Sequence, residues 1–115
     1  MGTAGNHLIP TTIYIPTKSN EGVPFMRSQY EAFENQLVAR GFGVSLEIGR
    51  IRGIWQDEHG VTFRDKSRQY SVAISSWRDV ATLIEVIDWA CAQFEQEAIF
   101  ATINGVPEIF TPVPP

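Results

Sequence analysis

Residues 44–74 have the pattern of β-strands and lie between two segments with helical periodicity. Apolar and polar residues alternate at the beginning and at the end of this stretch, as in strands with one buried face. The alternation breaks at Gly49, because its continuation would place Arg50 and Arg52 on the buried face, and a glycine bulge restores it. With the polar segment 56–60 as its turn, the stretch predicts a long bulged β-hairpin.

A first helix is predicted before this hairpin, over residues 24–40. Its apolar stripe, at helical spacing, consists of Met26, Tyr30, Phe33 and Leu37. The charged residues that face away from this stripe are Arg27, Glu31, Glu34 and Arg40. Gly41 follows as a C-terminal cap, since glycine adopts the left-handed conformation there without steric cost.

A second helix is predicted after the hairpin, with Ser76 as its N-cap and Asp79 three residues later in a capping-box pattern. Its wide buried face consists of Val80, Leu83, Ile84, Ile87, Ala90, Cys91 and Phe94. Trp89 falls nearly opposite this face, where an exposed tryptophan marks a contact surface. Trp89 is therefore our candidate interface residue.

Further strands are predicted on both sides of these elements, over residues 8–16 and 98–103. The dipeptide Asn104-Gly105 predicts a tight turn into an additional edge strand at 106–110. The order β-α-β-β-α-β followed by one more strand is that of a ferredoxin-like α+β sandwich with an antiparallel sheet and both helices on one face. In this arrangement we expect the bulged hairpin to be the central pair of strands.

The length of 115 residues fits a single domain, with an ordered core at about 7–111 and flexible ends at 1–6 and 112–115. The net charge of -4 argues against general attraction to nucleic acid or to anionic membranes. The sequence has neither a signal-peptide pattern at its start nor an uncharged apolar segment long enough to span a bilayer. We therefore expect a cytoplasmic protein.

Positive charge is concentrated in the hairpin, because residues 50–68 contain five basic and three acidic side chains, whereas the rest of the chain contains four and ten. An acidic protein can therefore present a local site for an anionic small molecule, bound by arginines. The candidate ligand-binding residues are Arg52, Trp55, Asp65, Arg68 and Tyr70. In the alternative interpretation these charges only solvate the hairpin and protect its edge from aggregation.

The sequence indicates no catalytic residue, no metal site and no cofactor. Asp57, Glu58 and His59 are adjacent, and because adjacent side chains rarely converge on one metal ion we interpret them as part of a turn. Cys91 is the single cysteine and lies in the apolar stripe of the second helix, where a buried thiol behaves as a small hydrophobic group. Phosphate-binding loops, nucleophile elbows and dinucleotide-binding fingerprints are absent from the sequence.

The hairpin carries the pattern Arg52-Gly53-x-Trp55-x-Asp57, then Gly60, then Asp65-x-Ser67-Arg68-x-Tyr70-x-Val72. This pattern resembles a family of small uncharacterised bacterial α+β proteins, a domain of unknown function. The resemblance extends over most of the chain, including residues 96–110. It implies the α+β fold and a bacterial cytoplasmic setting, and it implies no activity.

These features lead us to expect a homo-oligomeric binding or regulatory module without catalysis, with a second copy of the chain as its partner in a homodimer. The alternative is a small enzyme of the dimeric α+β-barrel type that acts on an anionic or aromatic small molecule, with Asp65 as its base. A weaker alternative is nucleic-acid binding by the basic hairpin, although the closely spaced aromatic residues of single-strand RNA binders are missing from its second strand.

Overall fold

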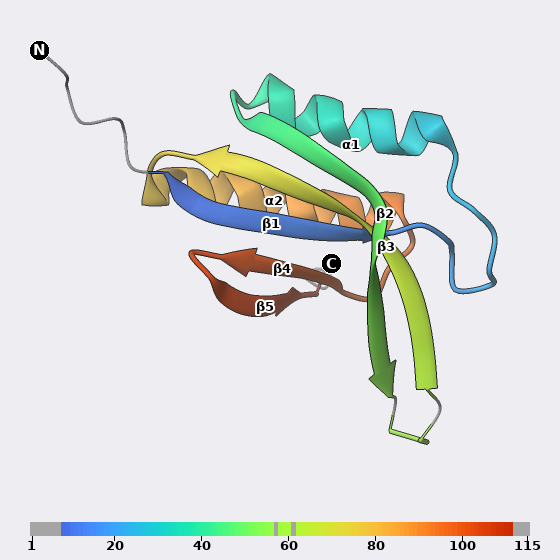
Figure 1. The fold of residues 1–115 in the computed structure, drawn as a ribbon. Helices are drawn as coiled ribbons and strands as arrows, with labels where there is room; N and C mark the ends of the chain where they lie inside the picture. The colour runs from blue at the N-terminus through green and yellow to red at the C-terminus, as the bar shows by residue number, and fades with distance from the viewer. Residues whose placement is uncertain (1–7, 57, 61, 112–115) are drawn as a thin grey trace, which may run out of the picture.

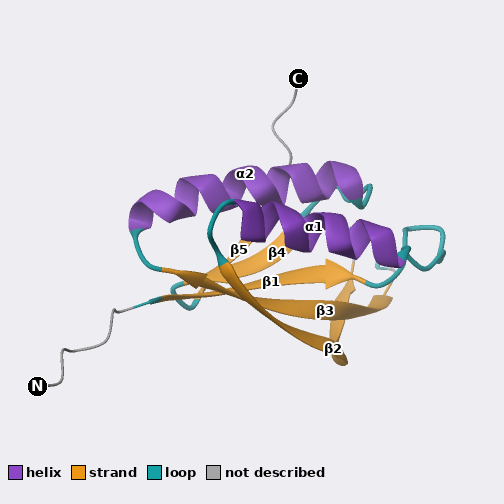
Figure 2. Ribbon diagram, turned by 90° about the horizontal axis from the view of Figure 1, so that it is seen from above, coloured by secondary structure: helices purple, strands orange, loops and turns teal. Residues whose placement is uncertain are grey.

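The computed structural model describes residues 8–56, 58–60 and 62–111, and for 47–56 and 62–65 it describes the backbone alone. Its elements, in chain order, are β1 (Ile9–Pro16), α1 (Arg27–Ala39), β2 (Gly43–Gln56), β3 (Thr62–Ile74), α2 (Trp77–Gln93), β4 (Ile99–Ile103) and β5 (Val106–Phe110). This order confirms the predicted α+β class, the βαββαβ order and the additional C-terminal strand. Both helices lie on one side of the sheet (Figure 2).

The five strands form one open antiparallel sheet in the order β2-β3-β1-β4-β5. The expectation that the hairpin is the central pair of strands is therefore wrong, because β2 lies at an edge and β1 lies at the centre. The two helical crossovers explain this arrangement, since each connects strands that run in the same direction and leaves one position between them. Strand β3 fills the position between β1 and β2, and β1 fills the position between β3 and β4.

The β2–β3 hairpin contains the predicted bulge. Glu47 lies opposite Gln69, whereas Ile51 lies opposite Ser67, so the register changes between Glu47 and Ile51. Strand β1 pairs with β3 only as far as Ser67, which lies opposite Pro16. Beyond that point the hairpin has two strands only, and it projects past the rest of the sheet (Figure 1).

The core lies between the helices and the inner face of the sheet. Ile13 and Ile15 of β1 and Tyr70 of β3 are fully buried there, because alternate residues of each strand face the helices. Four aromatic rings meet under α1 in edge-to-face or tilted contacts, and they belong to Phe25, Tyr30, Phe33 and Phe94. Met26 was predicted to belong to the buried stripe of α1, but its side chain is exposed because α1 begins only after it.

Both helices end with a left-handed residue. At the end of α1 the N–H groups of Gly41 and Phe42 donate to the carbonyls of Val38 and Leu37, with Gly41 at a φ of 85°. This is a Schellman motif, and it confirms the predicted glycine cap. The end of α2 has the same hydrogen-bond pattern, but there Glu95 occupies the left-handed position at a φ of 49°.

Candidate functional site

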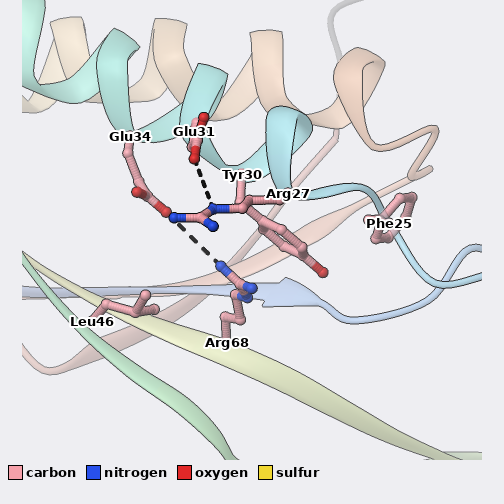
Figure 3. Close-up of a pocket in the computed structure, with 7 residues that line it drawn as sticks. All are labelled: Phe25, Arg27, Tyr30, Glu31, Glu34, Leu46 and Arg68. Carbon is pink, nitrogen blue, oxygen red and sulfur yellow. Dashed lines mark hydrogen bonds and ion pairs between the residues drawn. The ribbon is translucent and has the colours of Figure 1, made fainter.

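A cleft of about 500 Å³ opens between α1 and the β2–β3 side of the sheet. Its lining residues are Phe25, Arg27, Tyr30, Glu31, Glu34, Leu46 and Arg68 (Figure 3). Arg68 is two residues before Tyr70 on β3 and therefore lies on the strand face that the helices cover. Tyr30 and Glu34 are four residues apart on α1, so both lie on the side of the helix that borders the cleft.

A carboxylate and a guanidinium meet at the floor of this cleft, and a buried phenol reaches the carboxylate. The Tyr70 hydroxyl donates a hydrogen bond to Glu34 Oε2 over 2.7 Å, and Arg68 Nη1 lies 3.9 Å from the same oxygen. The Arg68 and Glu34 side chains are only 21% and 34% exposed. Because solvent reaches both groups poorly, their attraction is screened less than that of a surface ion pair.

Arg68 is also held from its other side by an aromatic ring. Its Cζ lies 3.5 Å from the centroid of the Tyr30 ring, a cation–π contact. The Tyr30 hydroxyl donates to the carbonyl of Pro16 over 3.1 Å, which fixes the ring against the end of β1. Arg68 is therefore oriented by a ring and a carboxylate that both come from α1 (Figure 3).

The ionisation of the two tyrosines follows from their surroundings. Burial raises the pKa of Tyr70 far above its usual range, and the hydrogen bond to the Glu34 carboxylate raises it further. Burial also raises the pKa of Tyr30, while the nearby Arg68 charge opposes that shift. Both hydroxyls are thus neutral hydrogen-bond donors at physiological pH. The cleft offers a carboxylate, a guanidinium and aromatic faces.

The rim of the cleft is more loosely built than its floor. Arg27 and Glu31 form an ion pair over 2.9 Å between neighbouring turns of α1, but their side chains are 90% and 55% exposed. Such exposed pairs contribute little to stability and exchange partners readily. A ligand could therefore recruit either group at small cost, whereas the contacts around Glu34 are already in place.

The structure brings together two of the five predicted ligand-binding residues, Arg68 and Tyr70. The ring of Tyr70 belongs to the core, and its hydroxyl reaches Glu34. The backbone positions of the other three lie in the projecting hairpin, where Arg52 pairs with Lys66, Trp55 with Phe63, and Asp65 with Gly53. The side chains of Arg52, Trp55 and Asp65 lie outside the described residues, so their predicted role stays a prediction.

Sequence reasoning missed the two residues that α1 contributes to the floor. Tyr30 was assigned to the core stripe and Glu34 to the solvent face, and both assignments are incomplete because these residues lie at the border between the two faces. Their spacing of four residues was the available signal, since it places a carboxylate directly beside a core aromatic ring.

The remaining candidates are Trp89 and Cys91. Trp89 was expected to be exposed, but it is partly buried and packs against the core, and its role as an interface residue stays a prediction. The homodimer stays a prediction. Cys91 is buried as predicted, its Sγ lies 3.7 Å from the Phe110 carbonyl oxygen, and burial raises the pKa of its thiol to about 11.

Metal sites and membrane-spanning helices are absent from the described part of the chain. Among the side chains that the structure describes, no group of three or more histidine, cysteine or acidic residues is arranged to hold a metal ion. Of the two helices described, neither has the length and apolar character needed to cross a membrane.

Comparisons with known proteins gave matches in structure only. No protein-family model matches the sequence, and no curated protein matches it, so the family suggested by the hairpin pattern was not found. The fold is similar to that of a phage SAM lyase in complex with S-methyl-5′-thioadenosine, with a TM-score of 0.64, 12% identity, and coverage of 96% of this chain and 95% of the lyase. A phage SAM lyase in its apo state matches with a TM-score of 0.63, 13% identity, and coverage of 96% and 94%.

This similarity overturns the expectation of a homo-oligomeric binding or regulatory module without catalysis. The structural match covers nearly the whole of both chains, and the matched protein is named as a lyase, which is an enzyme. The expectation rested on the lack of a recognisable catalytic motif, but a small-molecule cleft can be built from residues that form no contiguous motif. The enzyme alternative fits the comparison better.

Proposed function

We propose that this protein is a small enzyme that binds a sulfonium nucleoside of the S-adenosylmethionine type in the α1–β3 cleft and releases S-methyl-5′-thioadenosine from it. The observation that carries the proposal is the Glu34–Arg68 pair, which lines a cleft beside Tyr30 and whose carboxylate accepts a hydrogen bond from the buried Tyr70 hydroxyl. The similarity to phage SAM lyase over nearly the whole chain supports the choice of substrate.

The side chains of the cleft are complementary to the parts of such a substrate. A sulfonium and an α-ammonium group are cations, which favour the Glu34 carboxylate and the faces of aromatic rings. The substrate carboxylate is a ligand for a guanidinium, and Arg68 is already oriented by Tyr30 and Glu34. Phe25 and Leu46 provide apolar surface for the adenine ring.

Release of the thioether requires one bond to break, the bond between sulfur and the γ-carbon of the amino-acid side chain. The electron pair of this bond moves to sulfur, which becomes neutral. The four-carbon fragment leaves either by closing on its own carboxylate as a lactone, or by losing a β-proton to a base as an unsaturated amino acid. Neither route consumes water. Because the charge on sulfur disappears during the reaction, transfer from water into a partly apolar cleft favours it.

In this proposal each floor residue has one task. Arg68 binds the substrate carboxylate, Glu34 binds the cationic end, and Tyr70 keeps the Glu34 carboxylate in place by donating to it. Since Tyr70 holds its proton, it acts as a hydrogen-bond donor and not as a base. Glu34 is the group able to accept a β-proton if the fragment leaves by elimination.

The test is to incubate the protein with S-adenosylmethionine and to measure S-methyl-5′-thioadenosine by chromatography, against the spontaneous decay without protein. Mass spectrometry of the amino-acid fragment distinguishes lactone formation from elimination. We expect Glu34→Gln to lower kcat/KM by about 100-fold, the equivalent of ~2.7 kcal/mol for one removed charge partner. Arg78→Met serves as a matched control, because Arg78 is exposed in the first turn of α2 and outside the cleft.

Two results would count against the proposal. The first is thioether release no faster than spontaneous decay, together with no calorimetric signal for either S-adenosylmethionine or S-methyl-5′-thioadenosine. The second is equal activity of Glu34→Gln, Arg68→Met and the Arg78→Met control, with all three shown by circular dichroism to be folded.

A further inference from the structure

A second cavity lies at the end of β1, between the loop that leads to α1 and strand β3. Its volume is about 340 Å³. The chain contains only two lysines, Lys18 and Lys66, and both line this cavity although they are far apart in the sequence. The loop also contributes Ser19 and Asn20 to the lining.

The loop is attached to β3 through the backbone next to Lys18 and at Lys66. Both the backbone N–H and the hydroxyl of Thr17 donate to the carbonyl oxygen of Lys66, over 3.0 and 3.1 Å. Residue 18 forms an isolated β-bridge with Pro24, which closes the loop. The backbone on both sides of the cavity is therefore tied at the positions that carry the lysines.

The loop is also braced internally by Ser19. Its N–H donates to the carbonyl of Val23, its carbonyl accepts from the N–H of Gly22, and its Oγ accepts from the N–H of Val23. Gly22 has a φ of 82°, the left-handed conformation that glycine adopts without strain. Because Ser19 Oγ is engaged as an acceptor, its own proton remains to be donated.

The charges around this cavity favour an anion. The described residues that line it include both lysines and no acidic residue, since Glu21 of the same loop is exposed and is not part of the lining. Two positive charges that line one cavity repel each other, and an anion bound in the cavity lowers that cost. Lysine is a common ligand of phosphate, and the Ser19 hydroxyl and the Asn20 amide add neutral donors for further oxygens.

We propose that the 17–24 loop and Lys66 form a binding site for a phosphate group carried by a small organic molecule. A phosphate of charge between about -1.5 and -2 balances two ammonium groups better than a single carboxylate does. The cavity is larger than a phosphate group alone, so it has room for the organic part. This site is separate from the proposed function, since neither S-adenosylmethionine nor S-methyl-5′-thioadenosine carries a phosphate.

The site is also connected to the cleft by two hydrogen bonds. The Tyr30 hydroxyl donates to the carbonyl of Pro16, and the N–H of Phe25 donates to the carbonyl of Thr17 over 3.3 Å. Pro16 and Thr17 line the phosphate site, whereas Tyr30 and Phe25 line the cleft. A phosphate bound to the loop therefore holds the backbone that supports two aromatic walls of the cleft.

The experiment is an NMR titration of the full ¹⁵N-labelled chain with inorganic phosphate, and then with glycerol phosphate, at constant ionic strength set by sodium chloride. We expect saturable shifts at the amides of residues 17–22, with tighter binding of the ester. Either Lys18→Met or Lys66→Met should weaken binding by about ten-fold, the equivalent of ~1.4 kcal/mol. Arg78→Met is the control, because it removes one positive charge from α2, which follows the far end of the β1–β3 pair.

The proposal is overturned if chloride alone produces the same shifts, or if the lysine variants bind phosphate as tightly as Arg78→Met does. Pyridoxal phosphate followed by borohydride gives an independent readout, since it labels amines that lie beside a phosphate site. We expect labelling at Lys18 or Lys66 that inorganic phosphate suppresses, and labelling insensitive to phosphate contradicts the site. Thioether release depends on neither lysine, so failure here and failure of the proposed function are distinguished.

Discussion

The two helices cover the same face of the sheet, but α2 closes its half of that face whereas α1 leaves a cleft open beside it. Helix α2 buries Leu83, Val86, Ile87, Ala90 and Cys91 and closes the side of β4 and β5. Helix α1 buries three side chains, those of Tyr30, Phe33 and Leu37, and the positions beside them are charged. The cleft opens at those charged positions. A helix with a wide apolar face thus closes its half of the sheet, whereas a narrow stripe with charged borders leaves space for a ligand.

Ile87→Ala tests the closed half and carries the largest expected effect. The Ile87 side chain is fully buried, so its truncation removes apolar contacts and leaves a cavity. We expect a loss of about 2–5 kcal/mol in the free energy of unfolding. Urea denaturation measures it, with Val38→Ala on the exposed side of α1 as control, for which we expect a change within about 0.5 kcal/mol. Similar losses in both variants would mean that α2 does not close its half as described.

Tyr70→Phe tests the floor of the open half. The substitution keeps the ring and removes the hydroxyl that donates to Glu34, which leaves a partly buried carboxylate with a weaker set of partners. Since hydrogen bonds to charged groups contribute about 1.5–3 kcal/mol, we expect a destabilisation of that size. Tyr14→Phe is the matched control, because it makes the same chemical change and keeps the ring, through which Tyr14 packs on Phe100. An equal effect of both variants on the urea midpoint would contradict the role given to the Tyr70 hydroxyl.

The pH dependence of stability distinguishes the same two halves, because Tyr70 titrates beside α1 and Cys91 titrates in α2. The raised pKa of Tyr70 means that its contribution is complete below the unfolded value near 10 and declines as the pH rises above it. One such group lowers the free energy of unfolding by about 1.4 kcal/mol per pH unit in that range. The Cys91 thiol, with its pKa raised from 9.0 to about 11, acts in the same direction from pH 9 to pH 11.

Urea midpoints at pH 8, 9, 10 and 11 measure this dependence. We expect Tyr70→Phe to reduce the slope only above pH 10, and Cys91→Ala to reduce it already between pH 9 and pH 10. A slope that neither substitution changes would show that other groups control the alkaline loss of stability.

Glu95→Gly is expected to have the smallest effect and the opposite sign. Glu95 occupies the left-handed position after α2 that glycine occupies after α1, and a side chain there is strained by roughly 1 kcal/mol. We expect the substitution to stabilise the protein by about 0.5–1 kcal/mol, as a shift in the urea midpoint. Gly41→Ala at the equivalent position of α1 should lower the midpoint by a similar amount. Changes of the same sign in both variants would contradict the equivalence of the two caps.

Much of the fold could be predicted from local patterns. The break in alternation at Gly49 located the bulge, and Asn104-Gly105 located the last hairpin, because turn chemistry acts over a few residues. The place of the β2–β3 hairpin at the edge of the sheet was missed, since it depends on how the crossovers interleave. The exposure of Trp89 was also misjudged, because the face that α2 buries is wider than its periodicity indicated.

The site was predictable only in part. Arg68 and Tyr70 were found because they belong to one polar cluster of the sequence. Glu34 was assigned to solvent, because nothing in its own helix indicates that a tyrosine thirty-six residues later donates to it. A cleft formed by two distant elements depends on tertiary packing, and single-sequence patterns report on each element separately.

The burial of Cys91 under β5 has a practical consequence. The protein has one sulfhydryl, so a thiol-reactive dye can attach at one place only. Attachment requires α2 and the last strands to separate, and a high pKa leaves little thiolate until they do. The rate of dye attachment therefore measures how often this half of the molecule opens. A change in that rate when a nucleoside is added would show that a ligand bound beside α1 alters the opening of the α2 half.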